Sequence, residues 1–453
     1  MKTRRDFLRI GIGAASAFGA AGALSKLGEI NALAAGSPSY QALVCIFLSG
    51  GNDSNNTIVP ITTVQQNYSV YSAARQGLAL AQNSLLPIVT KSGDTYGLHP
   101  SMPEIQALYQ NGKAAIMANV GMLVVPLANN AAYNALPVGS PMVPVNLFSH
   151  SDQTSQWQMG TPTGLSSTGW GGRLADFVQA SNSGAQYPSV VNNGGCGPFC
   201  TGAQTLPGVV PTSGPIGLAG TGSDSARLNG SQQVLSFDNG LKLVQAANSI
   251  SNRGITQGAL LSNLLASATP LATQFPAGNP LGAQLQMVAR IIGVRSQLGL
   301  SRQIFFCSLD GFDTHGSEAS IQGPLLQQVS QAVSAFYSAT VELGVDSQVT
   351  TFTTSEFNRT VMSNSSGGTD HAWGGHHLII GSSVVGGDMY GSYPELAIGN
   401  PLDVTGRGSL IPTTSVDQYA ATLAAWFGVP AASMATVLPN VVNFPTQTLS
   451  FLG

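Results

Sequence analysis

Apolar residues along this chain fall into short unbroken runs that are separated by stretches with helical spacing. The first run covers residues 42–48 and is followed by Gly50 and Gly51. A run of this kind is typical of a strand that is buried on both faces of a parallel sheet. Similar runs predict four more strands, at residues 114–120, 303–309, 349–353 and 378–380.

Between these runs, apolar residues recur at the three- and four-residue spacing of amphipathic helices. This spacing extends over residues 281–298 and over residues 325–336, where we expect the helix to begin at Pro324. Ser415 and Gln418 form a capping box ahead of a further helix. Buried strands that alternate with helices predict an α/β fold with a doubly wound, mostly parallel sheet and helices on both faces.

Residues 182–235 depart from this alternation. They are rich in Gly, Pro, Ser and Asn and show no long apolar period. We interpret this segment as an insertion of loops and short strands within a single domain that spans residues 36–453.

The amino terminus has the pattern of an export signal. Arg4 and Arg5 form a twin-arginine core, an apolar run follows at residues 10–24, and residues 32–34 offer an Ala-x-Ala cleavage site. The run is shorter than the ~20 residues that span a bilayer, so residues 1–35 predict a twin-arginine signal peptide rather than a permanent membrane span. We expect the twin-arginine machinery to deliver a folded chain to the periplasm or the medium. The alternative is a chance Arg-Arg pair before a buried helix.

Charge is scarce, since Asp, Glu, Lys and Arg make up 8% of the sequence and the net charge is -3. Removal of residues 1–35 takes away five basic and two acidic residues, which moves the net charge to -6. No basic patch remains, so we expect no nucleic-acid partner.

The four cysteines are too few for a disulfide scaffold. Cys45 and Cys307 lie inside apolar runs and are expected to be buried thiols. Cys196 and Cys200 lie in a glycine-rich loop, where an oxidising compartment would favour a small structural disulfide. A redox role for this pair is the alternative.

Histidine and carboxylate side chains occur together at three places. His150 lies near Asp152, Asp313 near His315, and Asp370-His371 near His376-His377. Neutral imidazole and carboxylate together suit zinc, manganese or iron rather than calcium or magnesium. We therefore expect a divalent metal as cofactor, with zinc or manganese favoured.

Acidic residues also follow the predicted strands. Asp53 comes after the first strand, Asp313 and His315 come after the third, and Glu356 comes after the fourth. Ligands of open α/β sheets gather beyond the carboxyl ends of the strands. We expect these side chains to converge on one edge of the sheet, with Asp53 and Asp370 in one pocket.

Seven short motifs of the sequence resemble one known family. They lie at residues 47–53, 97–100, 149–150, 169–174, 312–315, 355–359 and 368–371. In these motifs the sequence is similar to the exported bacterial family of domains of unknown function numbered 1501, which is grouped with the alkaline phosphatase and sulfatase superfamily. The resemblance covers nearly the whole mature chain, and Gly-Thr-Asp-His at 368–371 is its most specific motif.

The resemblance implies an alkaline-phosphatase-like fold with one or two metal ions per chain. One ion would be held by Asp53, Asp370 and His371. The other would be held by Asp313, His315 and one of His376 and His377. Alkaline phosphatases space the Asp and His of the second site four apart, whereas Asp313 and His315 are two apart. Glu356 is the candidate for a replacement ligand.

The superfamily also places a nucleophile at the amino terminus of a helix, where free N–H groups favour an anionic oxygen. Ser101 fits this position, although Glu104 three residues later also fits a capping box. Ser54 and Thr57 are alternative nucleophiles. No cysteine has the Cys-x-Pro-x-Arg context of formylglycine sulfatases.

Two further side chains are candidates for substrate contacts. Arg359 would clamp an anionic ester through bidentate hydrogen bonds, or would pair with Glu356 and hold the turn. His150, with Asp152, would position the substrate or form a structural pair.

Taken with the resemblance, these residues indicate an exported metal-dependent hydrolase of phosphate or sulfate esters. Its substrate would be a small-molecule or polymeric anionic ester. The alternative function is a non-catalytic exported metal-binding or cell-envelope interaction protein that retains the fold.

Overall fold

The apolar runs of the sequence form a nine-stranded central sheet in the computed structural model. The structure describes residues 39–162, 166–195, 197–214, 216–217, 225–237 and 240–453. The predicted signal peptide and Cys196 of the predicted disulfide lie outside these residues. In order across the sheet, the strands are β11 (Met389–Tyr390), β5 (Ala114–Gly121), β10 (Gly375–Ile380), β9 (Val349–Thr354), β1 (Gln41–Ser49), β8 (Arg302–Asp310), β6 (Val190–Asn192) and β7 (Gly208–Val209), with β12 (Thr414–Ser415) beside β5.

Most neighbouring strands run parallel, and β10 runs antiparallel to both β5 and β9. The central strand β1 is covered on both faces, since residues 43–48 are no more than 4% exposed. Continuous burial of this kind explains why an unbroken apolar run is stable there. The predicted doubly wound, mostly parallel sheet is confirmed.

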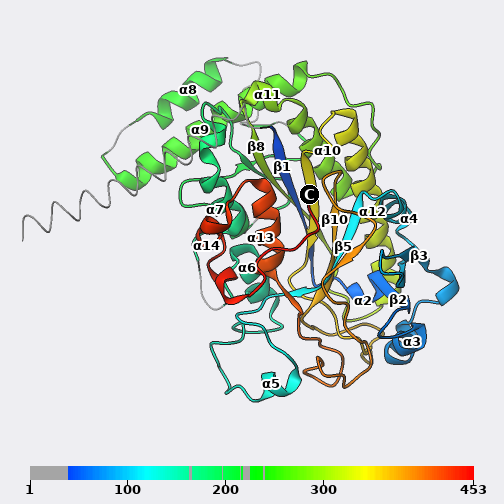
Figure 1. Cartoon of the computed structure of the whole chain (residues 1–453). Coiled ribbons are helices and arrows are strands. Elements are labelled where there is room, and N and C mark those ends of the chain that lie inside the picture. Colours follow the sequence, from blue (N-terminus) through cyan, green and yellow to red (C-terminus); the bar gives the residue numbers. More distant parts are fainter. Residues whose placement is uncertain (1–38, 163–165, 196, 215, 218–224, 238–239) are drawn as a thin grey trace, which may run out of the picture. The chain divides into compact units, whose positions relative to one another are not determined.

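Helices cover both faces of the sheet, as Figure 1 shows. On one face, Leu43, Cys45 and Phe47 share a hydrophobic cluster with four helices: α6 (His150–Met159), α7 (Trp170–Phe177), α13 (Val416–Phe427) and α14 (Met434–Val437). On the other face, α10 (Pro280–Gly293) packs against β8 and against α12 (Glu318–Glu342), which also contacts α4 (Pro103–Gln110). Alternate residues of β1 therefore face different helical layers.

The sequence predicts the start of one helix correctly and the start of another wrongly. The capping box of α13 is present, since the Gln418 amide N–H donates to Ser415 Oγ at 3.0 Å and the Ser415 N–H donates to Gln418 Oε1 at 2.9 Å. The predicted start of α12 at Pro324 is wrong, because the helix begins at Glu318 and Pro324 lies inside it. Contacts of Glu318 with Arg75 and Thr369 hold the turns before the proline, which outweighs the preference of proline for a first turn.

A second, three-stranded antiparallel sheet follows β1 in the sequence and was not expected. It consists of β2 (Ile58–Thr62), β4 (Thr95–Leu98) and β3 (Leu86–Val89), in that order. Two short helices flank it: α2 (Ser54–Thr57) and α3 (Tyr68–Arg75). This unit brings Arg75 toward the end of β1, where the candidate site lies.

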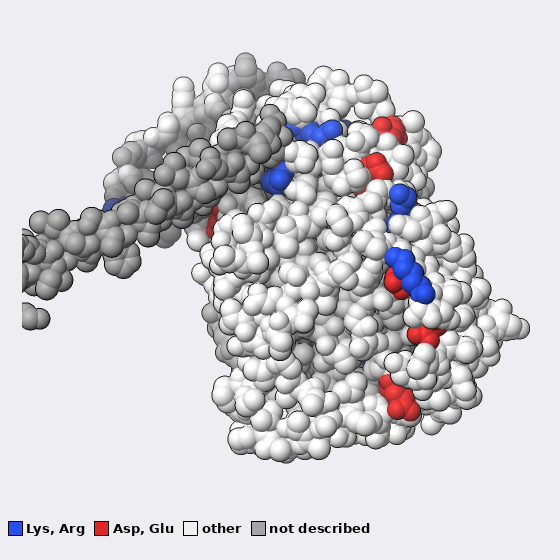
Figure 2. Space-filling model, viewed as in Figure 1, with Lys and Arg blue, Asp and Glu red and all other residues white. Residues whose placement is uncertain are grey.

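The remaining described elements lie mainly in and after the segment 182–235. That segment contributes β6 and β7 to the edge of the central sheet. No described helix combines the length and apolar character needed to cross a membrane. Charged side chains are sparse on the face drawn in Figure 2. The other helices are α5 (Asn130–Asn134), α8 (Ser225–Leu235), α9 (Lys242–Ser267) and α11 (Arg295–Leu298).

Candidate metal centre

Loops from four elements meet at one edge of the central sheet. The parallel strands β1, β8 and β9 end together there, with Ser49 opposite Asp310 and Phe47 opposite Thr354. Because β10 runs in the opposite direction, the loop that precedes it reaches the same edge. Helix α6 begins close by, since His150 at its first position contacts Glu356 just after β9.

Four side chains converge at this edge and form what we call the metal group: His150, Asp313, His315 and His371. Each offers one ligand atom, and the four atoms all lie within 4.8 Å of one another. Asp313 Oδ1 lies 3.4 Å from His150 Nε2, 3.2 Å from His315 Nε2 and 3.9 Å from His371 Nε2. The side chains of Asp313 and His315 are 51% and 46% exposed, so the group is open to solvent.

Hydrogen bonds at the other ring nitrogen orient the three imidazoles. His371 Nδ1 lies 2.7 Å from the carbonyl oxygen of Phe148, and His150 Nδ1 lies 2.8 Å from Glu356 Oε1. His315 Nδ1 lies 3.4 Å from Asp370 Oδ1. A carbonyl or carboxylate oxygen only accepts, so each Nδ1 donates its proton to that partner, and each Nε2 offers a lone pair when its ring is neutral. Histidines that bind metals are held by partners of this kind.

The convergence of these lone pairs favours a cation. His315 Nε2 and His371 Nε2 are 2.8 Å apart, and two lone pairs at this distance repel unless a proton or a metal ion lies between them. His150 Nε2 is buried and has no hydrogen-bond partner. A buried polar atom without a partner is costly, and a metal ion would remove that cost.

The distances and the charges also fit a transition metal. Tetrahedral ligands about 2.0–2.1 Å from one ion lie about 3.3 Å from one another, close to the 3.2 and 3.4 Å from Asp313 Oδ1 to the Nε2 atoms of His315 and His150. Burial lowers the pKa of His371 and keeps its ring neutral. Burial opposes ionisation of Asp313, but the hydrogen bond and charge of Arg359 outweigh it and lower the pKa of this carboxyl.

Two expected site residues, Glu356 and Asp370, lie beside the metal group without joining it. Glu356 is buried, and its Oε1 accepts from the Gly50 N–H at 2.9 Å as well as contacting His150. It orients His150, rather than serving as the replacement ligand. Asp370 contacts His315 and forms a 2.9 Å ion pair with Arg407.

Asp370 and His371 separate because their segment is extended. His371 forms an isolated antiparallel bridge with Arg359, and the Thr360 N–H donates to the Asp370 carbonyl at 2.9 Å. Adjacent side chains of an extended segment point in opposite directions. This geometry explains why His371 joins the metal group whereas Asp370 contacts it from outside.

Arg359 is fully buried, and protein oxygen atoms surround its guanidinium. Its guanidinium donates to the carbonyl oxygens of Gly50, Gly51 and Thr369 and to Asp313 Oδ1. It does not pair with Glu356 within the described residues. Arg359 therefore holds the ends of three loops and Asp313 together, instead of clamping an anionic ester.

Asp53 lies in a different cluster from the metal group. Its carboxylate forms a buried ion pair with Arg75, which also contacts Glu318 Oε1 at 2.9 Å. The sequence-based ligand set of Asp53, Asp370 and His371 is therefore not the one that the structure assembles, because an arginine already neutralises Asp53.

His376 and His377 also lie apart from the metal group, inside strand β10. His376 Nδ1 accepts from the Asn119 N–H at 3.0 Å, and the ring stacks on Tyr393 with centroids 4.4 Å apart. The His377 ring lies 5.2 Å from Trp157 and 5.9 Å from Tyr419. Both are packing residues here, because β10 begins three residues earlier than expected and carries them into the core.

Neither candidate serine hydrogen-bonds to the metal group among the described residues. Ser54 is 1% exposed, and its Oγ has no hydrogen-bond partner. The Ser101 N–H donates to His99 Nδ1 at 3.1 Å. The capping-box interpretation of Ser101 is wrong, since Met102 is the N-cap of α4 and makes no side-chain cap.

The sequence left His150 open between a substrate contact and a structural pair with Asp152, and it gave no sign of the carbonyl of Phe148. Asn146 and Phe148 adopt left-handed conformations, with φ of 51° and 69°. This conformation is uncommon for a bulky residue and is found at functional sites. The available signal was the Ser149-His150 pair, because Ser149 caps α6 and fixes where His150 begins the helix.

Comparisons with solved structures give distant likenesses. One is a protein in the alkaline phosphatase superfamily from Vibrio parahaemolyticus, with a TM-score of 0.35, 11% identity, and 88% of this chain and 69% of that chain covered. Another is the lipoteichoic acid synthase LtaP from Listeria monocytogenes, with a TM-score of 0.34, 7% identity, and coverage of 90% and 77%. The PsFucS1 sulfatase from Pseudoalteromonas sp. gives a TM-score of 0.32, 10% identity, and coverage of 88% and 74%.

These distant likenesses assign no activity to the chain. An activity can only be proposed from the chain's own residues. A search of curated proteins finds no match. A family model described as a protein of unknown function, DUF1501, matches residues 40–411. Because this match covers most of the sequence, the chain belongs to the DUF1501 family.

Proposed function

We propose that this chain is a metal-dependent hydrolase of phosphate or sulfate esters. The observation that carries the proposal is the convergence of three oriented Nε2 lone pairs with Asp313 Oδ1. His150, Asp313, His315 and His371 would hold a single zinc or manganese ion. When bound, such an ion supplies Lewis-acid chemistry at an ester oxygen.

The residues around the metal group support an anionic substrate. The side chain of Arg407 is 42% exposed and pairs with Asp370 beside His315. Its guanidinium is available to a phosphate or sulfate group, whereas Arg359 is buried. Glu356, Asp370 and the Phe148 carbonyl hold the protons at the Nδ1 atoms of the three imidazoles. Since neither Ser54 nor Ser101 hydrogen-bonds to the group, water is the proposed nucleophile.

Metal content and hydrolysis test this proposal together. The purified mature chain is expected to contain zinc or manganese and to cleave an aryl phosphate or an aryl sulfate. His371→Ala should lose the metal and the activity. It should also melt at a lower temperature, because a metal that binds only the folded state at 100 times its Kd contributes about 2.7 kcal/mol.

His99→Ala is the matched control, since His99 is buried away from the metal group. It should keep the metal content of the parent even if the fold loses stability. Equal metal content in His371→Ala and the parent would remove the main support for the proposal. Bound metal without hydrolysis of either ester would favour the alternative, a non-catalytic metal-binding or cell-envelope interaction protein, which the placement of the two serines also supports.

A further inference from the structure

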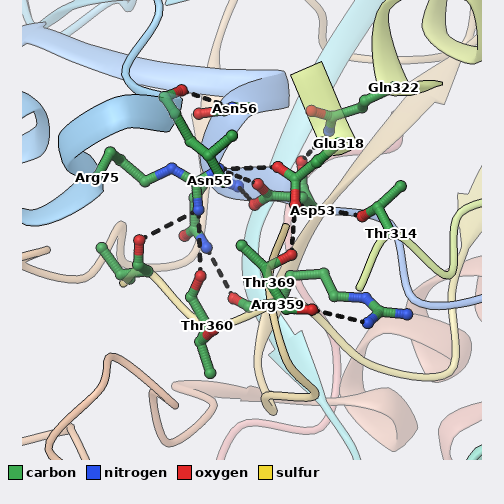
Figure 3. A network of polar contacts seen from close by, with 12 residues as sticks. Asp53, Asn55, Asn56, Arg75, Thr314, Glu318, Gln322, Arg359, Thr360 and Thr369 are labelled. Carbon is green, nitrogen blue, oxygen red and sulfur yellow. Dashed lines mark hydrogen bonds and ion pairs between the residues drawn. The ribbon is translucent and has the colours of Figure 1, made fainter. Parts of the chain in front are cut away.

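A cluster of buried charges lies next to the loops that carry the metal group. Asp53, Arg75 and Glu318 are each no more than 1% exposed, and Figure 3 shows them together. Arg75 comes from α3, beside the small sheet, whereas Glu318 begins α12. The three residues are far apart in the sequence, so the fold itself creates the cluster.

Arg75 is surrounded by oxygen atoms. Its Nη2 pairs with Asp53 Oδ2 and with Glu318 Oε1, and its Nη1 donates to the carbonyl oxygens of Thr360 at 3.1 Å and Val361 at 3.2 Å. Two carboxylates and two backbone carbonyls are ligands that hard divalent cations prefer. The hydrogen bonds of the guanidinium are incomplete in this position, because Arg75 Nε is buried without a hydrogen-bond partner.

The remaining carboxylate oxygens are already satisfied by the protein. Asp53 Oδ1 accepts from the Asn55 N–H at 2.9 Å. Glu318 Oε2 accepts from Thr314 Oγ1 at 3.2 Å and from Thr369 Oγ1. Only the two oxygens that face Arg75 therefore depend on its guanidinium. The guanidinium lies between them, at the position that a bound cation would take.

The charges in the cluster show what this occupant must balance. Burial, with the charge of Asp53 added, raises the pKa of Glu318 to about 8. Burial alone would lower the pKa of Arg75, but the charges of Asp53 and Glu318 outweigh it and raise the pKa. At neutral pH the raised pKa keeps a proton on Glu318, so one guanidinium and one proton balance the two carboxyl groups that a divalent cation would balance alone.

We infer that Arg75 takes the place of a metal ion between Asp53 and Glu318, so that the chain binds one metal ion and not two. Removal of the guanidinium should open a second cation site made of Asp53 Oδ2, Glu318 Oε1 and the carbonyl oxygens of Thr360 and Val361. The first part of this inference rests on the proposed function, since the single ion is the one at the metal group.

Metal stoichiometry of the full mature chain tests the inference. The parent protein, dialysed against manganese and then desalted, should contain one ion per chain, and His371→Ala should contain none. Arg75→Ala, purified in millimolar manganese, should contain two ions per chain. Its melting temperature should rise with manganese concentration over a range where the parent is already saturated.

Arg173→Ala is the matched control. Arg173 is a partly buried arginine whose guanidinium donates to the backbone carbonyls of Met159, Thr168 and Val437 and to a threonine hydroxyl, with no carboxylate among these hydrogen-bond partners. This variant should lose stability without gaining an ion, so it separates a new cation site from the general effect of removing a buried arginine.

Several outcomes would overturn the inference. Two ions per chain in the parent would do so and leave the proposed function intact. One ion in Arg75→Ala would also do so, as would an Arg75→Ala chain that stays unfolded in manganese while Arg75→Lys folds. No ion in the parent, together with one new ion in Arg75→Ala, would refute the proposed function and still support Arg75 as the occupant of a cation site.

Discussion

The position of a histidine in this fold decides its chemistry. His376 and His377 have the same imidazole as the metal group, yet burial lowers the pKa of each to about 3. Neither ring can be charged at neutral pH, and each has one nitrogen without a hydrogen-bond partner. The two residues therefore make folding sensitive to acid, although they lie outside the metal group.

The contribution of these two histidines to the stability of the protein should fall as pH decreases below about 6.5. In the unfolded chain these histidines take up protons near pH 6.5, whereas in the folded chain they resist protonation until about pH 3. Each contributes stability that is present above pH 6.5 and is lost by about 1.4 kcal/mol per pH unit below it. Urea unfolding at pH 7 and pH 5, compared between the parent and a variant that lacks one of the two rings, measures this contribution.

His377→Phe should reduce the acid sensitivity. Phenylalanine keeps the aromatic contacts with Trp157 and Tyr419 and removes one titrating group. The difference in the free energy of unfolding between pH 7 and pH 5 should therefore be about 2 kcal/mol smaller than in the parent. An unchanged difference would mean that His377 is not responsible.

At the scale of elements, the sequence predicts the strands better than it predicts their ends. The strands β1, β5, β8 and β9 are long buried runs, and a run of this kind has few other stable positions. The start of β10 is polar in sequence, because it reads Gly-His-His, and only its aromatic neighbours show that it is buried. The small sheet escapes detection because its strands have only four or five residues.

The candidate site was predicted in part, for a similar reason. The ends of parallel strands indicate where Asp313 and His315 lie. They do not indicate which carboxylate pairs with an arginine, because Arg75 lies on α3, beside the small sheet, and contacts Asp53 and Glu318 from there. Pairing between such distant residues has no local signal in one sequence.

The two loops that carry His315 and His371 are joined by Thr314, Thr369 and Glu318. The Thr369 N–H donates to the Thr314 carbonyl at 3.0 Å, and both threonine hydroxyls donate to Glu318 Oε2. Thr314 directly precedes His315, and Thr369 directly precedes Asp370 and His371. The spacing between the imidazoles of His315 and His371 therefore depends on this connection.

Thr369→Val should weaken metal binding without removing a ligand. Valine keeps the shape of threonine but cannot donate to Glu318, so the loops lose one connection. Loss of supporting contacts of this kind typically costs 10- to 100-fold in metal affinity, which zinc titration calorimetry would measure. Thr350→Val is the control, because Thr350 is buried in β9 and pairs with Ser383 instead. Equal affinity in both variants would show that the connection does not set the geometry.

At the scale of the whole molecule, the metal group exists only in the folded chain. Its four residues span 221 sequence positions, from His150 to His371, and an unfolded chain does not hold them together. Metal binding at this group would thus be coupled to folding. Export after folding would let the protein acquire its metal before it leaves the cytoplasm, which agrees with the twin-arginine signal predicted for residues 1–35.

Replacement of Arg4 and Arg5 by lysine together should block export. The twin-arginine pair is the feature that this machinery recognises, and lysine preserves the charge while changing the side chain. Cell fractionation should show the uncleaved precursor in the cytoplasm, whereas the parent appears in the periplasm or the medium as a shorter mature chain. Arg9→Lys is the control, since it lies outside the pair and should be exported like the parent. Delivery of the double variant at the parent's level would refute the twin-arginine assignment, and the proposed site of metal loading would then have to be sought outside the cytoplasm.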